Sequence, residues 1–199
     1  QLFLFYPPPD VVSVIIFQGH INDPASEFLV GWSGRVTQAK RTDEEVVLSC
    51  EPVATSMKRV GLRQNYQYSC TVELYGSRCG ANKAAATIQR PLQAVGANTV
   101  TLAAGWVAPG EVQKYLGGMI EWVNPAGDRE FRTILRIASD QILTLSGPTQ
   151  HLEVGSVVDV VKGCPRTMEG CLDHDNIHNY RACPFIPTTN PIGNVNQFY

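Results

Sequence analysis

The chain has 199 residues, of which 44% are hydrophobic and 17% are charged, and its formal net charge is -2. This length suggests one or two domains, and the hydrophobic fraction is sufficient for a buried core. The sequence contains no basic run, which argues against nucleic acid or an acidic membrane surface as a partner, while the low charge indicates that part of the surface contacts other protein.

The apolar stretch near the start of the sequence is interrupted by Pro7, Pro8 and Pro9. It is too short to span a bilayer, so we expect no membrane span. It also lacks the basic leading region and the small-residue cleavage site of a signal peptide. Because the sequence begins with Gln1 rather than methionine, a leader that has been removed stays open as an alternative.

Short β-branched segments separated by turn residues dominate the sequence. In the first part, the predicted strands are 11–17, 28–36 and 45–50, with a tight bend at Gly31 and Gly34 and a hairpin turn at 41–44. Further along, the predicted strands are 98–103, 119–123, 130–137, 141–145 and 157–161, and residues 110–116 are expected to form one or two helical turns. The pattern predicts a mostly β chain with a small antiparallel barrel or sandwich. From Asp173 onward, a composition rich in Asn, Pro and His predicts an irregular tail.

Six cysteines are the main chemical feature, and four of them form two pairs, Cys70 with Cys79 and Cys164 with Cys171. Without a secretion signal, a reducing environment is expected, where grouped cysteines more often bind metal. Four thiolates can complete a zinc site or hold a [4Fe–4S] cluster. Zinc sites usually pair cysteines two to four residues apart, so the wider spacing here weakly favours the larger cluster. Disulfides within each pair and plain buried thiols stay open as alternatives.

Other candidate residues lie beside these pairs. Cys50 ends a predicted strand and is expected to be a core thiol, whereas Cys183 is either a bystander or a substitute ligand. On a helix, His174 and His178 could join Cys171 in a zinc site. The surrounding Asn and Asp residues favour turns, so we interpret these histidines as solvated or turn-stabilising. No motif of a cysteine hydrolase, no phosphate-binding loop and no paired carboxylates occur, and we therefore expect no enzyme activity.

A wider set of residues around the cysteine pairs carries a family resemblance. The set consists of Cys70, Leu74, Tyr75, Gly76, Ser77, Arg78, Cys79, Gly80, Gly117, Gly118, Trp122, Gly163, Cys164, Arg166, Thr167, Cys171, Asn176, Asn179, Tyr180, Pro184, Pro187, Asn190 and Pro191. With them, residues 59–191 resemble a phage tail-tip family that includes the minor tail protein L of lambda-type phages and the hub proteins of related prophages and gene transfer agents. The sequence departs from this family at His174 and Asp175, where relatives usually carry Lys-Phe, and at Ala182 and Cys183 before the proline.

The resemblance implies a structural role in the virion. Proteins of this family form a ring, expected to contain three copies, at the end of a non-contractile tail. The ring lies between the distal tail protein and the central tip or host-specificity protein, and the chain would be assembled in the bacterial host cytoplasm.

The resemblance also implies an organisation and a cofactor. It gives an N-terminal β-rich hub region at 1–69, a cluster region at 70–86 and 162–199, and an inserted β domain at 87–161. In lambda-type relatives the C-terminal cysteines hold an iron–sulfur cluster, which implies a structural [4Fe–4S] cluster on Cys70, Cys79, Cys164 and Cys171, with Cys183 as a further candidate. A tail-associated thiol enzyme and a zinc-stabilised binding module stay open as alternatives.

Overall fold

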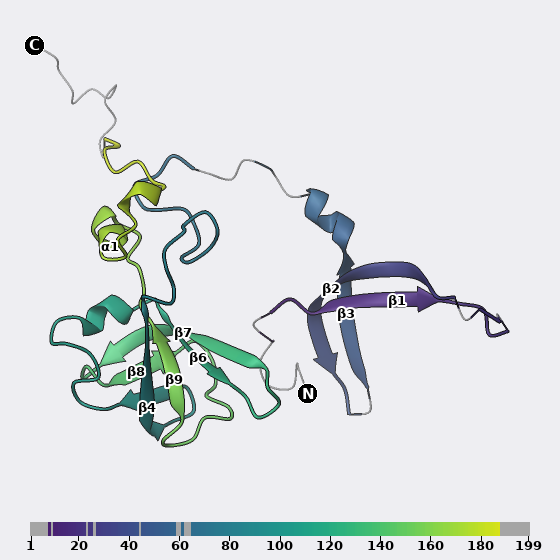
Figure 1. The fold of residues 1–199 in the computed structure, drawn as a ribbon, viewed down its shortest axis with the longest axis horizontal. Helices are drawn as coiled ribbons and strands as arrows, with labels where there is room; N and C mark the ends of the chain where they lie inside the picture. Colours follow the sequence, from purple (N-terminus) through teal and green to yellow (C-terminus); the bar gives the residue numbers. More distant parts are fainter. Residues whose placement is uncertain are drawn as a thin grey trace, which may run out of the picture. The chain divides into compact units, whose positions relative to one another are not determined.

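The chain forms two compact units, Gln1–Arg63 and Gln64–Tyr199 (Figure 1). The structure, a computed structural model, describes residues 8, 10–22, 24–25, 27–43, 45–58, 61 and 65–187. Parts of three predicted features therefore lie outside the described residues: two of the N-terminal prolines, position 44 of the hairpin turn, and the end of the C-terminal tail. In the described part, no helix is long and apolar enough to cross a membrane.

The N-terminal unit contains a three-stranded antiparallel sheet in the order β1-β2-β3. Its strands are β1 (Ser13–Gln18), β2 (Leu29–Arg41) and β3 (Val46–Pro52), and a short 3-10 helix, η1 (Val53–Lys58), follows. The three predicted strands are confirmed with shifted ends, but the bend predicted at Gly31 and Gly34 is wrong because β2 runs through both. Gly34 is required there for another reason: a Cβ atom at this position would collide with the Trp32 ring and with the carbonyl oxygen of Glu51.

The structure also contradicts the prediction that Cys50 is a core thiol. Cys50 is exposed, and so are its strand neighbours Val46, Val47 and Leu48. The apolar sequence of β3 indicated burial, but burial needs a second layer. No such layer covers the sheet among the described residues of this unit, and both faces therefore carry exposed apolar side chains.

The second unit is built on a closed barrel of six antiparallel strands, which confirms the mostly β fold and decides between barrel and sandwich. Around the barrel the strand order is β4-β5-β8-β7-β6-β9, and β9 pairs with β4 again. The strands are β4 (Thr87–Val95), β5 (Thr99–Leu102), β6 (Met119–Val123), β7 (Arg129–Ala138), β8 (Ile142–Leu145) and β9 (Val157–Val161). Its interior is filled by apolar side chains that include Val100, Leu102, Ile120, Ile134, Leu143, Val158 and Val160.

Five of the six barrel strands match predicted ones, while β4 was missed. Its sequence contains Pro91, which argues against a strand because proline cannot donate to a sheet ladder. The fold accommodates this residue at the last register position of the β4–β9 ladder, opposite Val157. Beyond it, a bulge between Leu92 and Ala94 changes the register as β4 continues along β5.

The remaining elements are short. A 3-10 helix, η2 (Val112–Tyr115), confirms the helical turn predicted at 110–116. After the barrel come a five-residue helix, α1 (Met168–Leu172), and a 3-10 helix, η3 (Ile177–Asn179). The rest of the described tail has no regular secondary structure, as predicted.

Barrel closure determines where the two cysteine-bearing segments lie. The first residue of β4, Thr87, pairs with the last residue of β9, Val161, and the backbone N–H of Lys162 donates to the carbonyl of Ala86 over 2.9 Å. The chain that enters β4 and the chain that leaves β9 therefore lie side by side at one end of the barrel. Cys70 and Cys79 precede this point, and Cys164 and Cys171 follow it.

Candidate metal centre

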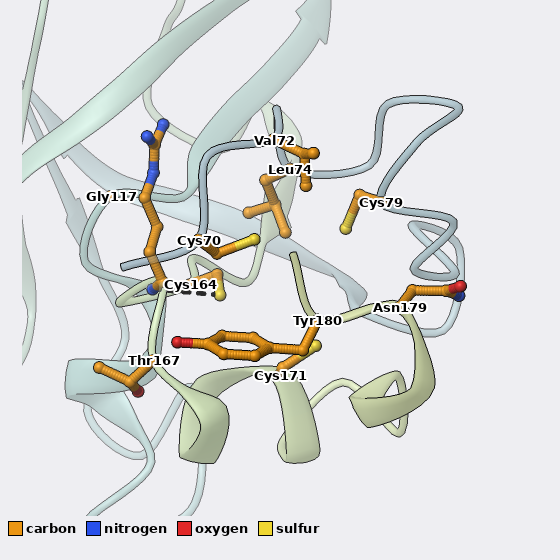
Figure 2. A pocket seen from close by; sticks show the side chains of 11 residues that line it. Cys70, Val72, Leu74, Cys79, Gly117, Cys164, Thr167, Cys171, Asn179 and Tyr180 are labelled. Carbon is orange, nitrogen blue, oxygen red and sulfur yellow. Dashed lines mark hydrogen bonds between the residues drawn. The ribbon is translucent and has the colours of Figure 1, made fainter. Parts of the chain in front are cut away.

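The four paired cysteines line one cavity of about 80 Å³. Figure 2 shows their sulfur atoms facing the same space. The cavity is well above the roughly 10–15 Å³ that a single water molecule needs, so it can hold a compact inorganic group. Its other lining residues are Val72, Leu74, Gly117, Arg166, Thr167, Asn179 and Tyr180.

The segment with the first pair is a loop fixed by turns and by hydrogen bonds to the other segment. The N–H groups of Cys79 and Gly80 both donate to the carbonyl of Gly76 over 3.0 Å, and Gly80 has a φ of 70°, which suits glycine. The N–H of Cys70 donates to the carbonyl of Arg166 over 2.9 Å. The bonds to Gly76 thus fix the turn at Cys79, and the bond to Arg166 holds Cys70 beside the chain that leaves the barrel.

The same loop is attached to the barrel by a buried carboxylate. Glu121 on β6 is 7% exposed, and its Oε1 lies 2.5 Å from Nζ of Lys83 and 2.6 Å from an Nη atom of Arg129. A buried charge is tolerated when it is paired in this way. Lys83 therefore links the loop that carries Cys79 to the barrel wall.

The second pair is joined by a tight turn: Cys164 precedes the turn, and Cys171 lies within the helix α1 that follows it. Helix α1 begins after Thr167, whose side-chain oxygen accepts a hydrogen bond from the N–H of Gly170 over 3.1 Å. A Cβ atom at Gly170 would lie 2.5 Å from Pro165 Cδ and 3.3 Å from Cys164 Sγ. Glycine at this position thus lets the helix, and Cys171 within it, approach Cys164 closely.

Gly163 brings this turn against the barrel. Its N–H donates to the carbonyl of Lys114 over 2.9 Å, and a Cβ atom there would collide with the carbonyl of Leu116 and lie 2.6 Å from the nitrogen of Gly118. The backbone that leads into Cys164 therefore has no room for a side chain. Gly118 faces Gly163 at this point, and it too has no room for a side chain, because a Cβ atom there would lie 2.8 Å from the nitrogen of Gly163.

The electrostatics of the thiols show that they lie near one another. Burial raises the pKa of Cys164, the backbone N–H of Arg166 at 3.4 Å from its sulfur lowers it, and the nearby thiols raise it again. Burial likewise raises the pKa of Cys171, and the other three thiols of the group add to this effect. Several thiolates at such proximity repel one another. A bound metal group would remove this repulsion, because its positive charge favours the deprotonated ligands.

The four cysteine sulfurs face one cavity (Figure 2). Across the described residues, no three His, Cys, Asp or Glu side chains are arranged to hold a single metal ion. A tetrahedral zinc ion with Zn–S bonds of about 2.3 Å requires its four sulfurs to meet at one atom. All six cysteines are free thiols, so the structure contains neither of the disulfides that the sequence left open.

The other candidate ligands lie away from the cavity. Helix α1 ends at Leu172, so the two histidines do not share a helix with Cys171. His174 places Nε2 2.8 Å from the carbonyl oxygen of Gly163 and packs edge-on against Tyr75, and His178 is exposed. His178 is thus solvated, as expected, whereas His174 is half-buried and bonds to a carbonyl in the segment that leaves the barrel.

Cys183 is half-buried and does not line the cavity. Its N–H donates to the carbonyl of Gln67 over 3.0 Å. It lines a different cavity, together with Tyr66 and Tyr180.

Two residues at the site received no role from the sequence. The Tyr75 hydroxyl donates to the carbonyl of Lys162 over 2.5 Å, which joins the two cysteine segments. Asn176 is buried and contacts both segments. Asn176 lies in an Asn-rich stretch that gives no periodic signal of burial, so its contacts could not be predicted from the sequence.

Comparison with known proteins gives two findings. Residues 113–190 match a family described as "Phage conserved hypothetical protein BR0599". The matched range contains strands β6 to β9 and the helices α1 and η3.

No curated protein matches the chain. Among solved structures, a chain of the "Virion of native gene transfer agent (GTA) particle" is similar with a TM-score of 0.69 and 20% identity, over 94% of this chain and 68% of that chain. This likeness shows a shared fold.

Replacing Gly163 tests the geometry of the site. Gly163→Ala should destabilise the barrel unit by about 1–3 kcal/mol and make the Cys164 thiol of the metal-free protein more reactive, because the added methyl displaces the backbone before Cys164. Denaturant unfolding and mass spectrometry of alkylated peptides measure the two effects.

Gly127→Ala is the control, since this glycine has a φ of 88° but open space around it. It should cost stability without changing the reactivity of Cys164. Wild-type stability and thiol reactivity in Gly163→Ala would contradict the close packing described above.

Proposed function

We propose that this chain is a structural protein of a phage-type virion and forms the hub at the tip of a non-contractile tail. The observation that carries this proposal is the fold, which is shared over 94% of the chain with a chain of a gene transfer agent virion. The match of residues 113–190 to a phage-conserved family independently supports the phage-type origin, whereas the place at the tail tip rests on the resemblance described above. In this role the chain forms a ring of three copies between the distal tail protein and the central tip or host-specificity protein.

The N-terminal sheet supports a role in assembly. Its strands expose large apolar side chains, including Ile15, Ile16, Phe17, Leu29 and Val46, each of which is at least half exposed. Contiguous exposed apolar surface is typical of sites that bind other protein. A hub that contacts its own copies and two other tail proteins needs such surfaces.

We further propose that Cys70, Cys79, Cys164 and Cys171 hold a [4Fe–4S] cluster. The residues fit this group, because four thiols from two chain segments line one cavity. Such a cluster takes one thiolate on each iron. When bound, it supplies a covalent link between the segment before β4 and the segment after β9.

The surroundings of the thiols favour a structural role over catalysis. Apart from the four cysteines and Arg166, the cavity is lined by apolar residues, glycine, Thr167, Asn179 and Tyr180, and no histidine or carboxylate lies among the described lining residues. A nucleophilic cysteine needs an adjacent base that takes its proton. His174, the nearest histidine in sequence, is directed at the carbonyl of Gly163 instead.

Metal analysis of the full chain, purified without oxygen, tests the cofactor. We expect a brown protein that absorbs at roughly 400 nm, the thiolate-to-iron transition of such clusters, with iron and acid-labile sulfide in equal amounts. Colourless protein with one zinc per chain would instead indicate a zinc-stabilised module. Disulfide-linked cysteines in freshly assembled particles would contradict both kinds of metal site.

Single serine substitutions test the ligand set. Cys70→Ser, Cys79→Ser, Cys164→Ser and Cys171→Ser should each lose iron and fail to restore tail assembly in host cells that lack the wild-type chain. Cys50→Ser and Cys183→Ser are matched controls outside the cavity and should keep both properties. Loss of iron in Cys183→Ser with full iron in Cys70→Ser would show that the assignment is wrong.

The place in the particle is tested separately from the cofactor. Antibody raised against the chain should label purified particles at the end of the tail farthest from the head, as seen by negative-stain electron microscopy. Label along the tube, at the head, or on no part of particles that contain the chain would contradict the hub assignment. Heads purified without tails serve as the control and should stay unlabelled.

A further inference from the structure

Asn176 connects the two cysteine pairs at the centre of the site. It is 7% exposed and follows helix α1 directly before η3. Its backbone carbonyl accepts a hydrogen bond from the Cys171 thiol over 2.9 Å. Its side-chain Nδ2 donates to the carbonyl of Cys79 over 2.7 Å and lies 3.6 Å from the sulfur of the same residue. One buried residue thus contacts a sulfur atom from each pair.

The orientation of this amide is fixed by a neighbour. Nδ2 of Asn179 donates to Oδ1 of Asn176 over 2.7 Å. Because Oδ1 accepts this bond, the amide cannot turn over, and its N–H groups must face Cys79. Asn179 itself lines the cavity, so the pair forms a short polar chain that leads from the cavity wall to the Cys79 sulfur.

We propose that Asn176 is a positioning residue for the bound cluster and that its amide N–H donates to the Cys79 thiolate, which raises the reduction potential of the cluster. This inference rests on the proposed function, since it concerns the cluster assigned there. A hydrogen bond to a thiolate is stronger than one to a neutral thiol, because the acceptor carries charge.

The direction of the effect follows from charge. Reduction adds one electron to the cluster and its thiolates, and a hydrogen-bond donor stabilises the more negative state more than the less negative one. Removing the donor therefore makes reduction harder. The bond forms in both oxidation states, so the potential changes only by the difference between them, which we expect to be roughly a tenfold change in the equilibrium constant for reduction and smaller than the contribution of the whole bond.

The test is a redox titration of the iron-loaded full chain, with dithionite as the electron donor. Asn176→Leu removes the amide at nearly constant size. We expect it to keep wild-type iron and sulfide but to have a midpoint potential about 59 mV lower, which is the tenfold change for a one-electron couple. Asn124→Leu is the control, because this amide bonds only within the β6–β7 turn and is not among the cavity-lining residues. It should leave the potential unchanged.

A second variant keeps the test decisive if Asn176→Leu does not fold. Asn179→Ala leaves Asn176 in place but frees its amide to turn, and it should lower the potential in the same direction by a smaller amount. Wild-type potential in loaded Asn176→Leu, or in Asn179→Ala when the first variant fails, would overturn the proposed hydrogen bond while leaving the cluster intact. A wild-type chain without iron would instead overturn the cluster itself.

Discussion

The antiparallel pairing of β4 with β9 is the constraint on which the candidate site depends. It closes the barrel and aligns Thr87 with Val161, so the segments outside these strands must meet at one end. Two cysteine pairs that are far apart in the sequence thereby come to line one cavity. No local motif has to bring them together, because the sheet ladder does so.

Hydrogen bonds between the two segments then shape the site before any metal binds. Cys70 N–H bonds to Arg166, the Tyr180 hydroxyl donates to the carbonyl of Tyr68 over 3.1 Å, and Cys183 N–H bonds to Gln67. Each bond joins a residue before the barrel to one after it. A cluster bound by all four thiolates would close the same long loop covalently, and its binding free energy would add to the stability of the fold. The two ends of the barrel unit thus already touch at the point where the proposed cluster would crosslink them.

Much of this arrangement could be predicted from the sequence, for identifiable reasons. The barrel strands are short, β-branched and bounded by turn residues, so periodicity located them, and β6 and β9 have the predicted bounds. The pattern failed where tertiary context decides. Pro91 argued against a strand at β4, which closes the barrel. The apolar neighbours of Cys50 suggested burial, although no second layer covers their sheet in the part of the unit that the structure describes.

The sequence singled out the four thiols that line the cavity, but not the residues that hold their two segments together. Paired cysteines can be recognised in a sequence by their residue type and spacing, whereas Asn176 and Tyr75 act through contacts that only the folded chain creates.

X-ray absorption at the iron edge of the oxygen-free protein tests the central claim that the four thiolates share one cluster. A shared cluster predicts iron surrounded by sulfur alone, with a second iron as its next neighbour. Iron bound by nitrogen or oxygen, or iron without an iron neighbour, would contradict it.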